Sequence, residues 1–361
     1  MSSEEKLQAI RTRIDALDEE LQALINERAS LAQEVARVKL ADGEEALFYR
    51  PEREAQVLRR VKERNQGPLP AEEVARLFRE VMSACLALEQ PMQIAFLGPE
   101  GTFSQEAVLK HFGHSALTLP MAAIDEVFRE VEAGSANYGV VPVENSTEGA
   151  INHTLDLLLK TPLKICGEVE LRIHDHLMTQ VDSLAEIKCV YSHAQSLAQC
   201  REWLDAHLAG VERVSVSSNA EAARLARDEA GAAAIAGYSA AELYDLKILE
   251  SNIEDDPNNT TRFFILGRDD VPASGKDKTA LLVSTKNKPG ALSQLLEPLA
   301  RHGISMTRIE SRPSRKGVWE YVFFVEIEGH QDEEQVASAL GALEREAAMY
   351  KILGSFPRAV L

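Results

Sequence analysis

The N-terminal segment carries an apolar pattern that only a long, packed helix satisfies. Apolar side chains recur there at alternating steps of three and four, and the register runs through position 28. Such a heptad pattern places one apolar seam along a helix, which must then pack against other helices along most of its length. The seam residues are Leu7, Ile10, Ile14, Leu17, Leu21, Leu24, Leu31, Val35 and Val38.

Arg28 occupies a seam position where the pattern otherwise has apolar side chains. A cation there needs an anionic partner or costs several kcal/mol. Lys39 follows about 11 residues later, on nearly the same helix face and about 16 Å along the axis, so the two cations can lean toward one small dianion. Arg11 lies about 25 Å from Arg28 and roughly 100° round the helix, so it reaches such a ligand only from an antiparallel second chain.

Two further helices are predicted after the first. The second opens near Tyr49, after a break at Ala41 to Ala46, and Pro51 suits its first turn. The third runs from about Ala71 to about Gln90. From the pattern alone, a helical dimerisation module with solvated or salt-bridged cations is an open alternative to a binding site.

Composition limits the classes of partner. With 361 residues the chain should hold two or three domains, and its 39 basic and 57 acidic residues give a formal net charge of −18, which repels nucleic acid and anionic membranes. No apolar run approaches a membrane-spanning helix and the N-terminus lacks a signal-peptide layout, so we expect a cytoplasmic protein. The scattered cysteines and histidines favour neither a disulfide framework nor a metal site, and no cofactor is expected.

Residues 91–270 alternate between strand and helix patterns, which predicts an open α/β sheet, divided into two lobes. Sites are expected at the strand ends and between the lobes. The expected strands lie near Met92 to Leu97, Tyr138 to Val143, Leu163 to Leu171, Lys188 to Tyr191, Arg213 to Val216 and Ala232 to Ala236.

Four polar loops stand out in this region. Gly98 to Ser104 is glycine-rich and leads hydroxyl groups into a helix, where backbone N–H groups suit a carboxylate or phosphate. Pro142 to Gly149 and Ser192 to Gln199 are denser in polar groups than a turn requires. Glu254 to Leu266, with Asn258 to Phe263 at its centre, reads as a polar loop followed by an apolar strand. Capping of the next helix explains any one of these loops, but is harder to accept for all of them.

A polar linker, Gly267 to Lys278, precedes a different pattern. The expected element order βαββαβ implies a small ferredoxin-like α+β domain, and no catalytic constellation is visible in it. The expected strands are Thr279 to Thr285, Ile304 to Ser311, Val318 to Glu328 and Lys351 to Phe356, and the expected helices are Pro289 to His302 and Glu333 to Glu346.

The N-terminal helices resemble the all-helical class of chorismate mutases over residues 5–90. In that family two chains intertwine and Arg11 of one completes the site of the other, which agrees with the distance argument above. The residues that match in order are Arg11, Arg28, Lys39, the Arg53-Glu54 pair and the Arg76-Leu77-Phe78 helix.

The rearrangement of chorismate to prephenate is pericyclic, so an enzyme selects the compact dicarboxylate conformer and stabilises charge on the ether oxygen. The resemblance implies that Arg11 and Arg28 hold the carboxylates, that Lys39 donates to the ether oxygen and that Glu54 takes the ring hydroxyl. Further residues expected beside the substrate are Arg50, Arg53 and Cys85.

Two positions depart from the commonest bacterial pattern of that family. Glu89 stands where a glutamine often donates a second hydrogen bond to the ether oxygen, and Arg50 stands where Asp is common. A carboxylate cannot donate, so Glu89 would act as a protonated catalytic group. We therefore expect mutase activity to fall as the pH rises through the pKa of Glu89.

The four polar loops together resemble prephenate dehydratases over about 180 residues, with Ala194 where that family usually has proline. Prephenate must lose its C4 hydroxyl and its ring carboxylate, which requires a proton donor at the hydroxyl. The resemblance implies that Thr261 is this donor and acts through a short, desolvated hydrogen bond. The residues expected around the substrate are Thr102, Glu144, Asn145, Ser146, Ser192, Gln199 and Arg262.

The C-terminal module resembles the ACT domain, an amino-acid sensor. Gly290-Ala291-Leu292-Ser293 and Glu310-Ser311-Arg312-Pro313 resemble the phenylalanine-binding motifs of dehydratase regulators. Gly290 would allow the ligand backbone to approach closely, and the second segment would shape the facing strand end. ACT domains usually pair, so a ligand between chains can bias a dimer. A stabilising module without a ligand is the alternative.

The three resemblances converge on one pathway. They imply a helical chorismate mutase domain (1–90), a two-lobed α/β dehydratase domain like the periplasmic binding proteins (91–270) and an ACT domain (277–361). The expected function is conversion of chorismate to prephenate and of prephenate to phenylpyruvate, with feedback by L-phenylalanine, in a homodimer or larger assembly. The alternatives are a dehydratase whose helical module only dimerises and a non-catalytic metabolite-binding regulator. We further expect phenylalanine to shift the Asn258 to Phe263 loop and its strand between two lobe arrangements.

Overall fold

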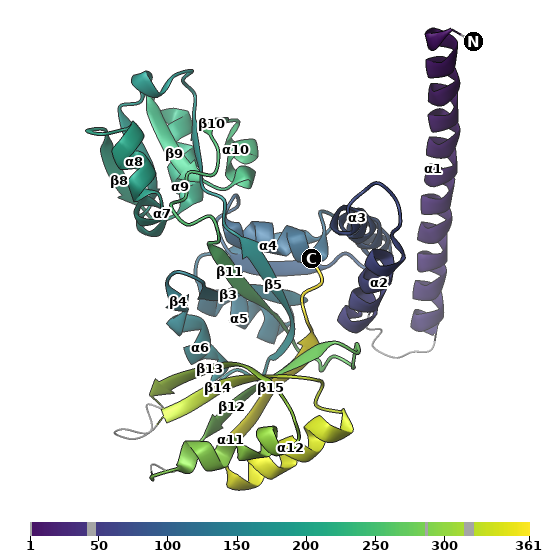
Figure 1. Cartoon of the computed structure of the whole chain (residues 1–361), viewed down its shortest axis with the longest axis vertical. Helices are drawn as coiled ribbons and strands as arrows, with labels where there is room; N and C mark the ends of the chain where they lie inside the picture. Colours follow the sequence, from purple (N-terminus) through teal and green to yellow (C-terminus); the bar gives the residue numbers. More distant parts are fainter. Residues whose placement is uncertain (1, 42–47, 286–287, 314–320) are drawn as a thin grey trace.

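The structure is a computed structural model that describes residues 2–41, 48–285, 288–313 and 321–361. N-terminal helices, a two-lobed α/β middle domain and a C-terminal domain follow one another along the chain (Figure 1). This order confirms the fold class expected from the sequence. Residues 42–46 of the expected break and 318–320 of an expected strand lie outside the described residues.

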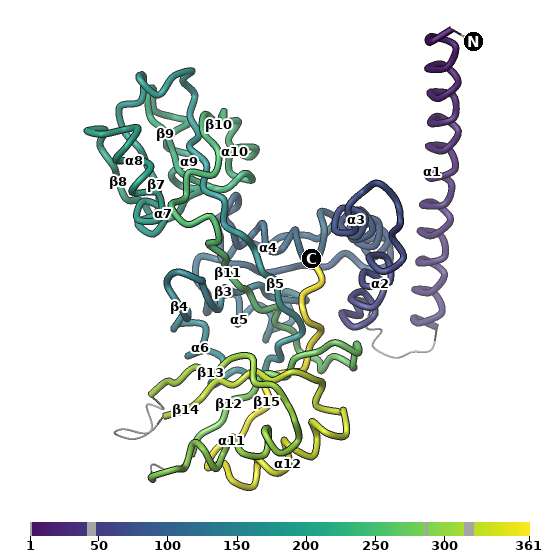
Figure 2. The backbone as a smooth tube through the Cα atoms, in the orientation of Figure 1, coloured from purple at the N-terminus to yellow at the C-terminus, as the bar shows by residue number. Residues whose placement is uncertain are grey.

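The heptad segment forms a single helix, α1 (Ser3–Ala41), which extends away from the rest of the chain and contacts α3 (Figures 1 and 2). Its apolar seam is largely uncovered, because Leu24 and Val38 are each 60% exposed and Ala36 alone is buried on this helix. The packing that the heptad pattern requires is therefore not satisfied within one described chain.

The next helices, α2 (Pro51–Arg64) and α3 (Ala71–Glu89), pack on each other and begin close to the expected positions. Pro51 takes the first helical position of α2, where its missing N–H costs nothing. Leu58 of α2 and Ala75 of α3 are completely buried in their shared core, and Val360 and Leu361 pack against it. The C-terminal residues thus lie against the N-terminal helices (Figure 1).

The first lobe of the middle domain is a mixed sheet in the order β2-β1-β3-β11-β5, with β4 beside β3. The strands β1, β2 and β3 are parallel, whereas β11 runs antiparallel between β3 and β5. Alternate residues of β1 enter different cores, since Ile94 packs with α4 and Ala95 with α5, so these helices cover opposite faces. The elements are β1 (Gln93–Leu97), α4 (Phe103–Phe112), β2 (Leu117–Met121), α5 (Ile124–Ala133), β3 (Tyr138–Asn145), β4 (Gly149–Ala150), α6 (Asn152–Leu158), β5 (Lys164–Arg172) and β11 (Thr260–Gly267).

The second lobe holds a sheet in the order β10-β6-β9-β7-β8, and residues 173–175 and 251–259 connect it to the first. Alanines on α9 and β9 are fully buried, which lets this helix lie close to the sheet. Its elements are β6 (His176–Thr179), a 3-10 turn (Leu184–Glu186), β7 (Cys189–His193), α7 (Ala194–Gln199), α8 (Arg201–His207), β8 (Glu212–Val216), α9 (Asn219–Asp228), β9 (Ala232–Ala236), α10 (Tyr238–Tyr244) and β10 (Lys247–Glu250).

The C-terminal domain has the expected βαββαβ order and an antiparallel sheet ordered β13-β14-β12-β15. One face of this sheet packs on its own helices, and the other packs on the first lobe, where Phe356 contacts Phe264 of β11 at 6.0 Å between ring centroids. In the described parts of the chain, no helix could span a membrane. The elements are β12 (Asp277–Ser284), α11 (Ala291–Arg301), β13 (Met306–Pro313), β14 (Tyr321–Glu328), α12 (Glu334–Glu346) and β15 (Met349–Pro357).

Candidate active sites

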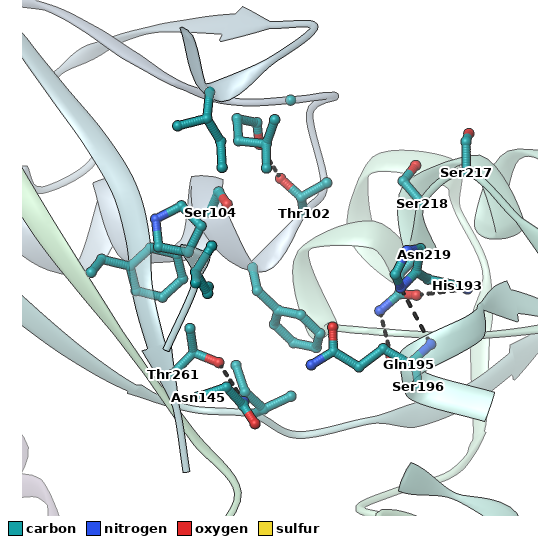
Figure 3. A pocket seen from close by; sticks show the side chains of 18 of the residues that line it. Thr102, Ser104, Asn145, His193, Gln195, Ser196, Ser217, Ser218, Asn219 and Thr261 are labelled. Atoms are coloured by element: carbon teal, nitrogen blue, oxygen red, sulfur yellow. Dashed lines mark hydrogen bonds between the residues drawn. The ribbon is translucent and has the colours of Figure 1, made fainter. Parts of the chain in front are cut away.

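A cleft of about 1010 Å³ lies between the two lobes (Figure 3). Loops that follow β1, β3, β7 and β8 line it, as expected for the carboxyl ends of parallel strands. Four of the residues predicted from the sequence line this cleft, namely Thr102, Asn145, Gln199 and Thr261. The polar loops that are scattered along the sequence therefore converge on one site.

Thr261 is held by a chain of side-chain amides at the cleft wall. Asn145 Nδ2 donates to Thr261 Oγ1 and to Asn259 Oδ1, at 2.9 Å each. Asn259 Nδ2 donates to Gln199 Oε1 at 3.0 Å, and Gln199 Nε2 donates to Thr147 Oγ1 at 3.2 Å, so the chain joins both lobes. Because Thr261 Oγ1 already accepts a hydrogen bond, its own proton is left for an acceptor in the cleft.

Helices α4 and α9 both begin at the cleft wall. Thr102 stands at the N-cap of α4, but its hydroxyl donates to the carbonyl oxygen of Pro99 at 2.9 Å, and the first turn has no side-chain cap. A carboxylate of a ligand is favoured at such helix starts. Sequence reasoning missed Ser217, Ser218 and Asn219 at the start of α9, although three polar residues directly after an expected strand were a signal.

Two predicted residues lie behind or beside the cleft rather than in its wall. Ser192 is completely buried, and its hydroxyl is shared between the Ile235 carbonyl oxygen at 2.8 Å and Asn219 Oδ1 at 3.0 Å. It therefore orients Asn219. Ser146 is exposed, and its Oγ accepts a hydrogen bond from the backbone N–H of Thr260 at 3.0 Å, which ties the β3 loop to the start of β11.

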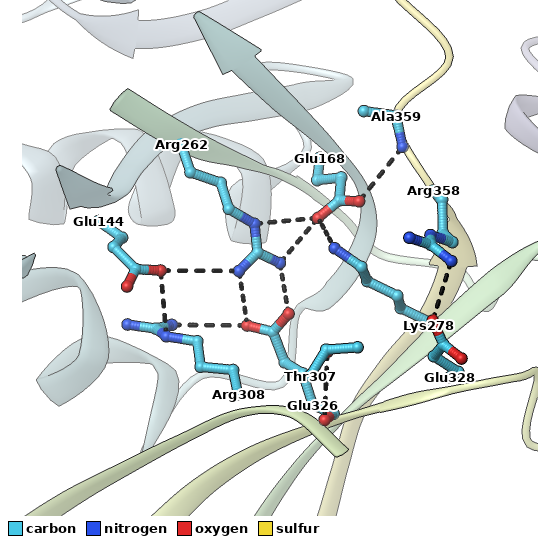
Figure 4. Close-up of polar contacts among 10 residues, drawn as sticks. All are labelled: Glu144, Glu168, Arg262, Lys278, Thr307, Arg308, Glu326, Glu328, Arg358 and Ala359. Atoms are coloured by element: carbon cyan, nitrogen blue, oxygen red, sulfur yellow. Dashed lines mark hydrogen bonds and ion pairs between the residues drawn. The ribbon is translucent and has the colours of Figure 1, made fainter. Parts of the chain in front are cut away.

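Glu144 and Arg262 do not line the cleft, in contrast to their expected place beside the substrate. Their side chains point toward Arg308 and Glu326 of the C-terminal domain (Figure 4). Successive strand residues point to opposite faces, so the cleft position of Thr261 puts Arg262 on the far face, and that of Asn145 does the same for Glu144. There Arg262 Nε donates to Glu168 Oε2 at 2.9 Å, and the guanidinium also contacts the C-terminal domain.

The helical domain brings together Arg28, Lys39 and Glu89 of the predicted mutase site. Glu89 of α3 is partly buried, and burial raises its pKa while nearby Lys39 and Arg28 of α1 lower it. Lys39 Nζ lies 5.4 Å from the ring centroid of Phe48. Cys85, one helical turn before Glu89, is buried on the same face of α3. The cluster thus combines the two predicted cations with a carboxyl group that holds its proton to a higher pH than an ordinary glutamate.

Glu54 lies apart from this cluster, at the junction with the middle domain. Arg79 of α3 forms an ion pair with it, with Nε 3.0 Å from Oε1. The same guanidinium donates to the carbonyl oxygen of Lys110 at 3.0 Å and to that of His111, near the end of α4. Burial raises the pKa of Glu54, and Arg79 opposes this rise. Within one chain, Glu54 is therefore engaged with Arg79 rather than with the α1 cations.

The remaining predicted mutase residues, Arg11, Arg50 and Arg53, are exposed. Arg11 lies about 25 Å along α1 from Arg28, in agreement with the sequence estimate, because α1 is one continuous helix. Arg50 pairs with Glu52 at 2.5 Å. Within one chain, therefore, only some of the predicted mutase residues lie together.

The segments predicted to bind phenylalanine are largely exposed on the C-terminal domain. Gly290 precedes α11 with φ of 77°, a conformation that glycine adopts readily, and Leu292 is 36% exposed. Glu310 to Pro313 belong to β13, an edge strand whose outer side is open to a second chain. Arg312 in this segment pairs with Asp156 of α6 at 2.7 Å, so it contacts the middle domain.

Buried titratable side chains lie where residues 173–175 and 251–259 connect the two lobes, and the sequence analysis did not single them out. Asp175 is completely buried, and neither of its carboxylate oxygens has a hydrogen-bond partner of good geometry among the described residues. Burial raises its pKa to about 7, with the nearby Ser196 hydroxyl opposing and Glu254 and Glu106 adding to the rise. No group of His, Cys, Asp and Glu side chains arranged to hold a metal ion occurs in the described part of the chain.

Comparison with known proteins bears on both sites. The sequence matches the family chorismate mutase type II over residues 10–90, prephenate dehydratase over 94–271 and the ACT domain over 279–345. A bifunctional chorismate mutase/prephenate dehydratase of Stutzerimonas stutzeri is 60% identical over 365 residues, and one of Pseudomonas aeruginosa is 59% identical over 368 residues, each alignment covering 100% of both chains.

Among solved structures, the prephenate dehydratase of Arthrobacter aurescens in complex with L-Phe superimposes with a TM-score of 0.69 at 34% identity. The match covers 74% of this chain and 90% of that one. The full-length relatives align over the whole chain, and so include its helical domain. The chain belongs to the family of bifunctional chorismate mutase/prephenate dehydratases.

Proposed function

We propose that this protein rearranges chorismate to prephenate and then converts prephenate to phenylpyruvate, under feedback inhibition by L-phenylalanine. The observation that carries the proposal is the Asn145–Thr261 hydrogen bond in the interlobe cleft, because it leaves the Thr261 hydroxyl free to donate its proton into the cleft. The family relatives that match the whole chain support the pairing of the two activities.

In the dehydratase step, Thr261 donates its proton to the departing C4 hydroxyl of prephenate, which leaves as water. The C–C bond to the ring carboxylate breaks, CO₂ leaves, and the electron pair of that bond enters the ring as it becomes aromatic. Thr261 recovers its proton from solvent, so one proton is consumed per turnover. The side-chain carboxylate of prephenate lies at the uncapped first turn of α4, near Ser104, across the cleft from Ser218 at the start of α9.

The mutase step needs no nucleophile, so its residues act by holding the reactive conformer and by stabilising charge. Arg28 and Lys39 of one chain face the chorismate dianion, and protonated Glu89 donates to its ether oxygen. Arg11 comes from a second copy of the chain. The exposed apolar seam of α1 supports this arrangement, because a second α1 would cover it.

The assembly we propose is therefore a homodimer, joined through α1. A second contact through the edge strand β13 would place two copies of Gly290 to Ser293 and Glu310 to Pro313 around bound phenylalanine. We take residues 1–90, 91–270 and 277–361 as the domains, in keeping with the ranges of the family matches. The cytoplasmic location stays a prediction from the sequence.

One assay tests the proposal against its alternatives. Purified protein is given chorismate or prephenate, and prephenate and phenylpyruvate are followed separately, with and without L-phenylalanine. We expect both products from chorismate and inhibition of phenylpyruvate formation by the effector. Phenylpyruvate from prephenate without turnover of chorismate would favour a dehydratase whose helices only dimerise. Neither product would favour a metabolite-binding regulator.

A further inference from the structure

A network of charged side chains joins the first lobe to the C-terminal domain (Figure 4), and all of them are nearly or fully buried except that of Glu144, which is 38% exposed. Its acidic and basic groups balance, which lets them lie together away from water. We call it the interdomain charge network; it consists of Glu144, Glu168 and Arg262 from the middle domain and Lys278, Arg308 and Glu326 from the C-terminal domain.

The network contacts the sheet at Arg262, the residue next to the proposed proton donor Thr261. On the antiparallel strands β3 and β11, Thr261 is paired with Asn145, and the next pair is Arg262 with Glu144. The two pairs are separated by one peptide unit on each strand, and they point to opposite faces. A displacement of the charged pair is therefore transmitted directly to the pair that carries the Thr261 hydroxyl.

Both members of the charged pair are held from the C-terminal domain. Arg308 Nε lies 3.2 Å from Glu144 Oε2, and Arg308 Nη1 lies 3.5 Å from Glu326 Oε1. Glu326 also receives both terminal nitrogens of Arg262, with Nη1 to Oε1 at 3.0 Å. The side chains of Arg262, Arg308 and Glu326 are 12%, 10% and 4% exposed. Such two-pronged, desolvated contacts fix direction as well as distance.

The opposite edge of β11 is held in the same way. Glu168 of β5 contacts Arg262, Lys278 Nζ at 2.9 Å and the backbone N–H of Ala359 at 3.2 Å. Strand β11 is thus gripped on its far face by β12, β14 and the C-terminal residues, while its near face carries Thr261.

The gripping residues also lie close in sequence to an expected effector segment. Arg308 is on β13, two residues before Glu310, and it pairs across the sheet with Glu326 of β14. A ligand that moves β13 at Glu310 to Pro313 therefore moves the strand that holds Glu144.

We propose that Arg308 and Glu326 are positioning residues for the dehydratase reaction, because they hold Glu144 and Arg262 and thereby set the Asn145–Thr261 pair in the cleft. The inference rests on the proposed role of Thr261 as the proton donor. It also reassigns Glu144 and Arg262, which the family resemblance places at the substrate, to holding the sheet from behind. The catalytic hydroxyl is then aimed by the sensor domain of its own chain.

A double-mutant cycle on Arg308→Met and Glu144→Gln tests this assignment. Prephenate turnover is measured as kcat and KM, and chorismate turnover in the same samples reports on the integrity of the protein. We expect each single substitution to lower the dehydratase kcat by roughly 10- to 100-fold, the cost of misplacing a reacting group by about 1 Å, with KM little changed. The double variant should be no worse than either single variant, because both break the same contact.

The matched control is Arg358→Met. Arg358 pairs with Glu328 on β14 at 3.0 Å, two residues from Glu326, but this exposed pair does not contact the interdomain charge network. The kcat of the Arg358→Met variant should equal that of the wild type. If Arg308→Met also reduces mutase activity, Arg308→Lys serves in its place, since it keeps the charge but loses the two-pronged contact, and it should lower kcat less.

Three results would overturn the assignment: an increase in KM alone for Glu144→Gln, multiplicative losses in the double variant, or an unchanged kcat for Arg308→Met. Failure of the underlying function is distinguishable, because it would show as a Thr261→Val protein with undiminished dehydratase activity. If Thr261→Val is inactive while Arg308→Met is normal, the donor stands and the positioning role falls.

Discussion

Replacing Asp175 by asparagine should change how the stability of the second lobe depends on pH. The pKa of Asp175 rises to about 7 in the folded protein because the carboxyl group is buried, against roughly 4 in an unfolded chain. A carboxyl group with a raised folded pKa stabilises the fold only while protonated. Its contribution is therefore complete below about pH 4 and is lost as the pH rises through 7.

The size of the effect follows from proton linkage. Between pH 5 and pH 7, Asp175 has lost its proton in the unfolded chain but keeps it in the folded protein. Each pH unit in this range lowers the free energy of unfolding by about 1.4 kcal/mol, so the fall between pH 5 and pH 8 is roughly 3 kcal/mol. Asparagine cannot ionise, so the free energy of unfolding of Asp175→Asn should not show this fall. The variant should therefore be more stable than the wild type at pH 8. Glu254 and Glu106 still face position 175, and Glu106, whose pKa burial also raises, keeps a smaller pH dependence.

Urea unfolding at pH 5 and pH 8 measures this difference, followed by the fluorescence of Trp203 on α8 in a Trp319→Phe background. Asp205→Asn is the control, because the Asp205 side chain is 63% exposed on α8 of the second lobe, and it should behave as the wild type. An Asp175→Asn protein with the wild-type pH dependence, or one less stable than the wild type at pH 8, would refute the reasoning.

Other predictions concern the mutase site and the effector. Glu89→Gln should flatten the decline of mutase activity with rising pH, because burial raises the pKa of Glu89 and only its protonated form donates; a level wild-type profile would contradict this. Co-expressed Arg11→Ala and Arg28→Ala chains should recover mutase activity that neither has alone, since one site of a mixed dimer keeps both arginines, and no recovery would argue against sharing between chains. Saturating L-phenylalanine should alter hydrogen exchange at residues 258–266 while it inhibits the dehydratase; inhibition with unchanged exchange would exclude this route.

The elements that the sequence predicts well are those with a strong internal period. The heptads give α1 to within a few residues, and the βαββαβ order of the C-terminal domain is confirmed. Strands β2, β6 and β10 were not predicted. They are four or five residues long, β2 and β10 are sheet edges, and β2 contains Pro120, so their strand pairing comes from neighbours rather than from local pattern.

The candidate sites were predictable in part. Four dehydratase residues converge on the cleft because loops after parallel strands meet at one sheet edge. Side chains alternate between the two faces of a strand, and this alone was enough to place Arg262 on the face opposite Thr261. The family resemblance instead implied that both residues lie beside the substrate. The burial of Asp175 depends on how two crossing segments pack, and the pairing of Glu54 with Arg79 depends on how two domains meet. Neither is encoded in a local pattern.

The most direct test of two reactions at two sites in one chain is to remove each with a single substitution. Given chorismate, Thr261→Val should accumulate prephenate while phenylpyruvate formation falls by roughly 100-fold or more, because the isosteric side chain has no proton to donate. Lys39→Met should leave chorismate unconsumed but convert supplied prephenate at the wild-type rate. Wild-type phenylpyruvate formation by Thr261→Val, or loss of both activities from either substitution, would contradict the account.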